Sequence, residues 1–127
     1  MSRGAPLAWI ASALNGIGNV YQGRGQFDEA LRYYRLAVEI EPRYGYAWHD
    51  MFSALDAQAR RGGPIEVATM HEALGKVIET GAGLPGLGQD KIALLQSCLG
   101  HWEQVAGSPK TSAGKSKSRA SAKPRRR

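Results

Sequence analysis

The sequence has one cysteine, Cys98, among its 127 residues. A single cysteine can form neither a disulfide within the chain nor a pair of thiolate metal ligands, so a disulfide-stapled secreted domain is excluded. The chain also lacks a run of about eighteen uninterrupted apolar residues, which a membrane-spanning helix requires. Its first residues contain no aliphatic stretch long enough for a signal peptide. These absences favour a cytoplasmic protein with no membrane contact.

Acidic residues are absent from the last part of the chain, where the basic residues gather. Residues 110–127 contain eight Lys and Arg and no Asp or Glu, whereas residues 1–109 contain nine basic and eleven acidic residues. Large apolar residues are absent after position 107 as well, and such a segment cannot bury enough surface to offset its ordering entropy. We therefore expect a helical domain over residues 1–107 and a disordered basic tail over residues 108–127.

Within the domain, apolar residues recur at three- and four-residue spacing between Gly and Pro breakers, which is typical of amphipathic helices. No stretch shows the alternation of a half-buried strand. Helices are expected near residues 6–23, 27–41, 44–60, 65–80 and 89–105, with Ile78 and Val105 on the apolar faces of the last two. Because short connections join them, the sequence predicts an all-α fold of antiparallel helix pairs.

Residues 11–44 carry a repeat signature that spans the first helix pair. Its matching positions are Leu14, Ile17, Gly18, Tyr21, Ala30, Tyr34, Ala37 and Pro42. This spacing resembles that of the tetratricopeptide repeat, W-x2-L-G-x2-Y…A-x3-F…P, with Leu14 in place of Trp and Ile17 in place of Leu. The resemblance implies helix pairs stacked as a short α-solenoid, in which these residues are expected to form the packed core.

A second, degenerate repeat is expected over residues 45–80. Trp48 stands at the family's Trp position, but Phe52 stands where a small residue belongs and must push away or rotate the partner helix. Pro64 occupies the site of the second helix's Ala, and the apolar spacing resumes three to six residues late, which predicts an insertion. Residues 89–105 are expected to form a capping helix or the first helix of a third unit.

The resemblance further implies a concave groove, lined by the first helix of each pair, that holds a peptide or a partner helix. The groove positions of the family fall on Asn15, Asn19, Gln22, Tyr46, His49, Asp50 and Ser53, with Ser12 and Asp56 beside them. Asn and His side chains donate and accept hydrogen bonds, which suits the main chain of an extended peptide. Asp50 stands where chaperone-binding members carry an Asn that holds a carboxylate, so a neutral or basic ligand is favoured. The resemblance thus implies a non-enzymatic adapter.

No residue pattern predicts catalysis, a cofactor or a metal site. Residues 81–86 fit G-x-G-x-x-G by letters, but they follow a predicted helix, whereas the dinucleotide fingerprint follows a strand. Cys98 and His101 lie one helical turn apart, yet a zinc site needs three or four ligands. His71 falls in an apolar stripe, which is typical of a hydrogen-bonded core histidine.

The basic tail supports an alternative, a nucleic-acid- or ribosome-associated protein. A cluster resembling a short nuclear-import signal lies at its end, which favours a nuclear location if the source is a eukaryote. It consists of Lys123, Arg125, Arg126 and Arg127. Such a tail binds phosphates weakly and without sequence preference. A solubilising or cloning-derived end is the other interpretation. At the opposite end, an apolar N-terminal edge that includes Trp9 is expected to favour self-association.

Overall fold

A computed structural model of the chain describes residues 4–81 and 84–107, and these form an all-α fold, as predicted. The helices, in chain order, are α1 (Gly4–Gly23), α2 (Phe27–Ile40), α3 (Gly45–Arg60), α4 (Val67–Thr80) and α5 (Gln89–Val105). Each end lies within two residues of its predicted position. The predicted disorder of residues 108–127, and with it the division into domain and tail, falls outside the described residues.

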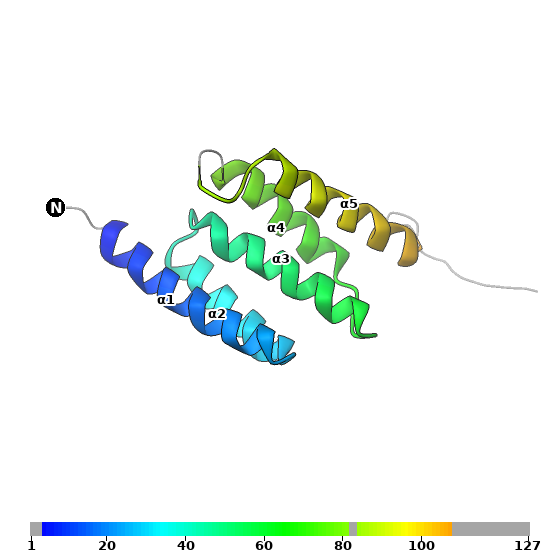
Figure 1. Ribbon diagram of the computed structural model, residues 1–127, viewed down its shortest axis with the longest axis horizontal. Helices are drawn as coiled ribbons and strands as arrows, with labels where there is room; N and C mark the ends of the chain where they lie inside the picture. The colour runs from blue at the N-terminus through cyan, green and yellow to red at the C-terminus, as the bar shows by residue number, and fades with distance from the viewer. Residues whose placement is uncertain (1–3, 82–83, 108–127) are drawn as a thin grey trace, which may run out of the picture.

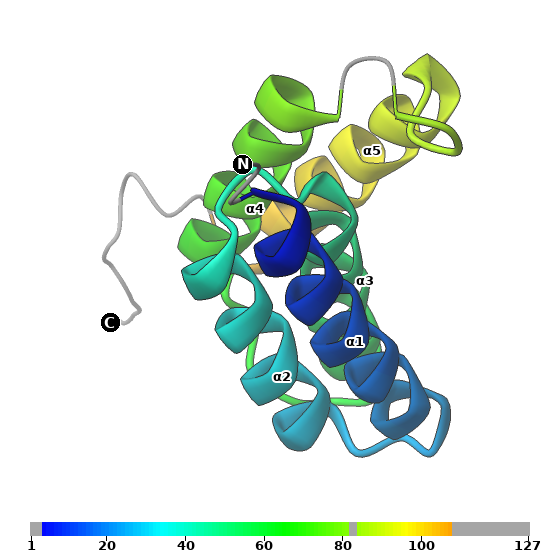
Figure 2. The ribbon, with the colours of Figure 1, turned by 90° about the vertical axis from the view of Figure 1, so that its left-hand side faces the viewer.

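Each helix packs against the next one in the chain, and consecutive helices run antiparallel (Figure 1). Two further contacts join α1 to α3 and α3 to α5, whereas α2 and α4 make no such close backbone approach within the described residues. The helices α1, α3 and α5 are therefore closely spaced and form the inner layer of the stack. The helices α2 and α4 form the outer layer (Figure 2).

The first helix pair is held close by a small residue packed against a large one. A Cβ atom added to Gly18 of α1 would lie 2.5 Å from Cε1 of Tyr34 in α2, so no larger side chain fits there without movement. The turn between the two helices contains Gly25 with φ of +76°, a left-handed conformation that glycine adopts without strain. Gly18 and Tyr34 both belong to the repeat signature, and both lie in the packed core that the signature predicts for them.

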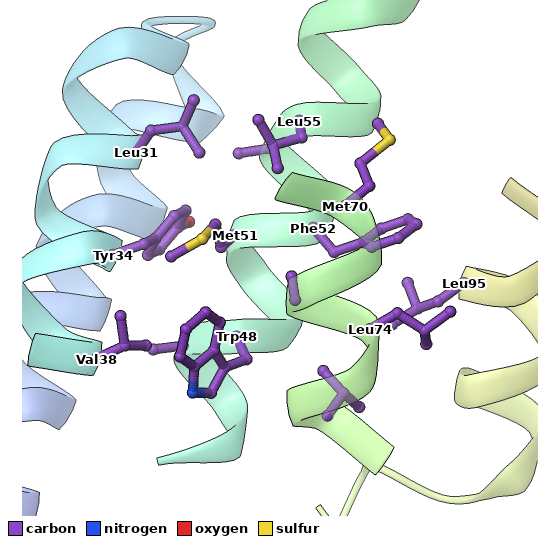
Figure 3. Close-up of a cluster of buried hydrophobic side chains, with 14 of the residues drawn as sticks. Leu31, Tyr34, Val38, Trp48, Met51, Phe52, Leu55, Met70, Leu74 and Leu95 are labelled. Atoms are coloured by element: carbon purple, nitrogen blue, oxygen red, sulfur yellow. The ribbon is translucent and has the colours of Figure 1, made fainter. Parts of the chain in front are cut away.

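The core runs through the stack from α2 to α5 (Figure 3). Its large members are Leu31, Tyr34 and Val38 of α2, Trp48, Met51, Phe52 and Leu55 of α3, Met70 and Leu74 of α4, and Leu95 of α5. Phe52, at the position of the expected small residue, is fully buried and lies between α3 and α4. The expected insertion lies in the connection 61–66, which has three more residues than the connection 24–26.

Five expectations about single side chains are wrong. Pro42 is exposed rather than part of the packed core. Ile17 is 41% exposed rather than buried in the core, because no helix packs on the outer side of α1. Ile78 and Val105 fit apolar stripes in the sequence, but both point to solvent on α4 and α5. His71 is also exposed, and its Nε2 lies 2.5 Å from Oε2 of Glu103, which makes it a surface link between α4 and α5.

None of the helices in the described ranges combines the length and apolar character needed to cross a membrane.

Candidate functional site

Two side-chain hydrogen bonds join the inner faces of α1 and α3. The amide Nδ2 of Asn15 donates to Oδ2 of Asp50 at 2.9 Å. About two turns further along α1, the Nε2 of Gln22 donates to Oγ of Ser53 at 3.1 Å. The partners are 35 and 31 residues apart in the sequence, so these bonds align the first helix pair with the second. Four of the seven predicted groove residues are thus brought together in pairs.

Tyr34 of α2 lies in the core and holds two of the predicted groove residues by hydrogen bonds. Its ring is fully buried, and its hydroxyl lies 2.5 Å from Oδ1 of Asn19 and 2.7 Å from Oε1 of Gln22. Burial raises the pKa of the Tyr34 hydroxyl, and the negative charge of Asp50 raises the pKa further. The hydroxyl therefore remains a proton donor at neutral pH and orients the α1 amides from the core.

Asp50 accepts hydrogen bonds on both of its carboxylate oxygens. One comes from Asn15, and the other oxygen lies 3.0 Å from Nδ1 of His49. Asn15 itself is only 7% exposed, and its Oδ1 has no hydrogen-bond partner among the described residues. Asn15 and Asp50 therefore build the wall between α1 and α3, while the half-buried ring of His49 lies beside them nearer to solvent.

Tyr46, the last of the predicted groove residues, connects the start of α3 to the segment that precedes α5. Its hydroxyl donates to the backbone carbonyl of Pro85 at 2.6 Å. The side chain therefore holds a loop in place as well as lying at the end of the inner layer.

A cleft of about 250 Å³ lies between α3 and α5 on the inner layer. Its walls are His49, Phe52, Ser53 and Asp56 of α3 and Lys91, Leu94, Leu95 and Cys98 of α5. The α3 wall is mainly polar and contains two predicted groove residues, whereas the α5 wall is mainly apolar. Leu94 at the α5 wall is 60% exposed, which leaves an aliphatic side chain available to a ligand.

Asp56 fixes the width of this cleft by joining α3 to α5. Its Oδ1 accepts a hydrogen bond from Nε1 of Trp102 at 2.7 Å, and its Oδ2 accepts one from Nε of Arg60 at 2.9 Å. A terminal nitrogen of Arg60 lies 3.9 Å from Sγ of Cys98, also on the α5 side. The Asp56 carboxylate is thus occupied by internal donors and acts mainly on the position of α5.

Sequence reasoning missed the whole α5 wall of the cleft. The partnership of Asp56 with Trp102 spans 46 residues and leaves no local signal in one sequence. Leu94 did carry a readable signal, because it is a large apolar residue that lies off the buried stripe of Ile92, Leu95 and Leu99. The predicted tail residues, Lys123, Arg125, Arg126 and Arg127, lie outside the described residues.

A larger hollow, of about 530 Å³, lies away from the inner layer, where the α1–α2 turn meets the end of α3. The Arg61 guanidinium lies over the Phe27 ring at 5.3 Å, and Asp28 and Glu29 line the same hollow. Its charges of both signs lie at the surface and indicate no single ligand chemistry. Within residues 4–81 and 84–107, no group of three His, Cys, Asp or Glu side chains is placed to hold a metal ion.

Comparison with known proteins adds a family to this geometry. Residues 11–44 match the family described as Tetratricopeptide repeat, over the same range that the sequence signature covers. The match and the five sequentially packed helices agree with a short stack of such repeats. Repeats of this kind form modules for interaction between proteins. A search of curated proteins found no match to the chain.

Proposed function

Because residues 11–44 are a tetratricopeptide repeat, we propose that the chain is a non-enzymatic adapter that binds a peptide or helix of another protein on its inner layer. The observation that carries this proposal is the cleft between α3 and α5, where polar His49 and Ser53 face the exposed Leu94. A binding site for a peptide needs apolar surface to bury and a few polar groups that fix orientation. The cleft offers both.

The polar groups of the inner layer suggest how a peptide backbone is held. His49 and Ser53 line the cleft, and Asn19 and Gln22 continue the polar surface onto α1. Asn19 is exposed and uses its carbonyl oxygen toward Tyr34, so its amide nitrogen can donate a hydrogen bond to a ligand. Asn15 is too deeply buried to contact a ligand directly, and its proposed role is to hold Asp50.

The charges suggest a neutral or basic ligand. Asp50 and Asp56 contribute two carboxylates, of which Asp56 is paired with Arg60, and Lys91 contributes one cation on the opposite wall. An acidic group that approaches Asp50 would meet a like charge, and this repulsion disfavours acidic ligands there. We propose an uncharged or basic segment with one aliphatic or aromatic side chain that packs between Leu94 and Leu95.

A displayed library of short random peptides, selected on the full chain, tests this proposal. Selected peptides should share an apolar residue and lack Asp and Glu. In amide chemical-shift mapping, residues of α1, α3 and α5 should respond. Leu94→Asp should weaken binding at least tenfold, because it places a charge on the apolar wall.

Ile78→Asp is the matched control, because Ile78 is 46% exposed on the outer helix α4. It should leave the affinity unchanged. Shift changes confined to α2 and α4, or equal effects of the two substitutions, would refute binding in the cleft.

The basic tail supports a second candidate function, contact with nucleic acid. Residues 110–127 carry eight Lys and Arg and no acid. Such a segment attracts phosphate backbones through counterion release. We propose that this contact is weak, lacks sequence preference and is independent of the cleft. A cytoplasmic location, with nuclear import in a eukaryotic source, is part of the same proposal.

A further inference from the structure

The first helix of the stack presents a large surface without charge. Between Gly4 and Gly23, α1 contains no Asp, Glu, Lys, Arg or His. It packs against α2 and α3 only, so its outer side is uncovered within the described part of the chain. Five large apolar residues of α1 are 40–78% exposed. These residues are Leu7, Trp9, Ile10, Ile17 and Val20.

One stripe of this surface combines a protruding side chain, Trp9, with a position that has no side chain, Gly16. Trp9, Ala13, Gly16 and Val20 follow one another at three- and four-residue spacing and so share one side of the helix. Trp9 is 78% exposed and is the most exposed large apolar residue described. A Cβ added to Gly16 would meet no atom within 4 Å, so the helix backbone is open to solvent there. Protrusion and gap lie about two turns apart.

We propose that this surface is covered by a second copy of the chain. Two α1 helices cross antiparallel about a twofold axis near Ala13, and Trp9 of each copy packs over Gly16 of the partner subunit. A twofold contact uses the same patch on both subunits, so a patch that contains both a protruding Trp and an open Gly complements itself. Trp residues near the centre of an interface typically dominate its binding energy.

The chemistry of the surface favours this occupant over a charged one. A charged partner would lose hydration on contact with α1 without gaining an opposite charge. An identical helix has no charged group that must lose its hydration, because it is equally free of charge. The small residues at the crossing allow the two backbones to approach closely, as small residues do wherever helices pack tightly.

The exposed apolar area supplies the larger part of what a stable dimer needs. Five large side chains at an average of about half exposure represent on the order of 500 Å² per copy, if each fully exposed side chain offers about 200 Å². A standard interface buries about 800 Å² per partner. Neighbouring small residues of α1, such as Ala13 and Gly16, add to this area.

Sedimentation equilibrium of the full chain over a range of concentrations, at moderate salt, tests the proposal. We expect a reversible monomer–dimer equilibrium without larger species. Trp9→Ala should raise the dimer dissociation constant at least tenfold, because it removes the protruding ring. Gly16→Glu should do the same by filling the gap with a charge.

Gly16→Glu also separates association from folding. A Cβ added at Gly16 meets no atom within 4 Å, and Glu is the better helix former, so this variant should melt at or above the temperature of the parent at matched monomer concentration. Trp9 is the one exposed Trp of the three, so dilution of the parent should shift its emission to longer wavelength. Trp9→Phe should abolish this shift.

Leu94→Glu, at the opposite end of the stack, is the control and should leave the dimer intact. A parent that remains monomeric at high concentration would overturn the proposal, and so would a dimer unaffected by Trp9→Ala and Gly16→Glu. Species larger than a dimer that Leu94→Glu disperses would also overturn it, because they would indicate head-to-tail stacking.

Discussion

At the scale of single residues, the contact of Gly18 with Tyr34 sets the distance between α1 and α2. A Cβ at Gly18 would lie 2.5 Å from the Tyr34 ring, which is itself fully buried and cannot move aside freely. Gly18→Leu should therefore lower the free energy of unfolding by about 1–3 kcal/mol, the usual cost of overpacking a core. Urea denaturation measures this change.

Gly75→Leu is the matched control, because a Cβ there meets no atom within 4 Å. It should unfold at the parent's urea concentration or higher, and equal losses in both variants would mean that helix registers differ from those described.

Tyr34 also predicts a pH dependence. Burial raises the pKa of its hydroxyl in the folded chain, while in the unfolded chain the pKa is about 10. Above pH 10 the unfolded chain therefore releases a proton that the folded chain retains. The contribution of Tyr34 to the free energy of unfolding is fully present below that pH and decreases as the pH rises further. Tyr34→Phe should show less of this decline between about pH 9 and 11. An unchanged difference between parent and variant across that range would show that Tyr34 is exposed to solvent.

At the scale of elements, a buried hydrogen bond helps to fix the position of α5 against α3. Asp56 of α3 accepts from the indole of Trp102, which is only 6% exposed. Asp56→Ala leaves the buried N–H unpaired and should cost about 1–3 kcal/mol. Hydrogen exchange should accelerate over residues 89–105 and remain unchanged over α1 and α2. Asp56→Asn retains an acceptor for Trp102 and should lose much less. Uniform acceleration along the whole chain would show instead that the stack opens as a single unit.

At the scale of the whole molecule, charge separates the repeat stack from the residues after it. Residues 1–109 have a net charge of −2 from nine basic and eleven acidic residues, and residues 110–127 carry +8. The full chain should bind a fluorescent DNA duplex weakly, with log K falling against log salt at no more than about 0.9 per phosphate contact. A chain ending at residue 109 should not bind it. Tight, salt-resistant binding by the shorter chain would assign nucleic-acid contact to the helical stack and weaken the adapter proposal.

The sequence by itself determined the helices, their order and the first repeat, because these depend on local spacing. Gly18 and Tyr34 lie in one repeat register, and Gly and Pro mark the helix ends, so period and breakers suffice to locate them. Only the tertiary structure decided which polar side chains face each other across repeats. Asn15 pairs with Asp50 over 35 residues, and Trp102 pairs with Asp56 over 46 residues. A single sequence carries no signal for pairs of residues that lie so far apart. The same holds for exposure. Ile17 and Tyr34 both occupy core positions of the repeat pattern, but only Tyr34 has a helix on its far side, and a side chain is buried only where another element covers it.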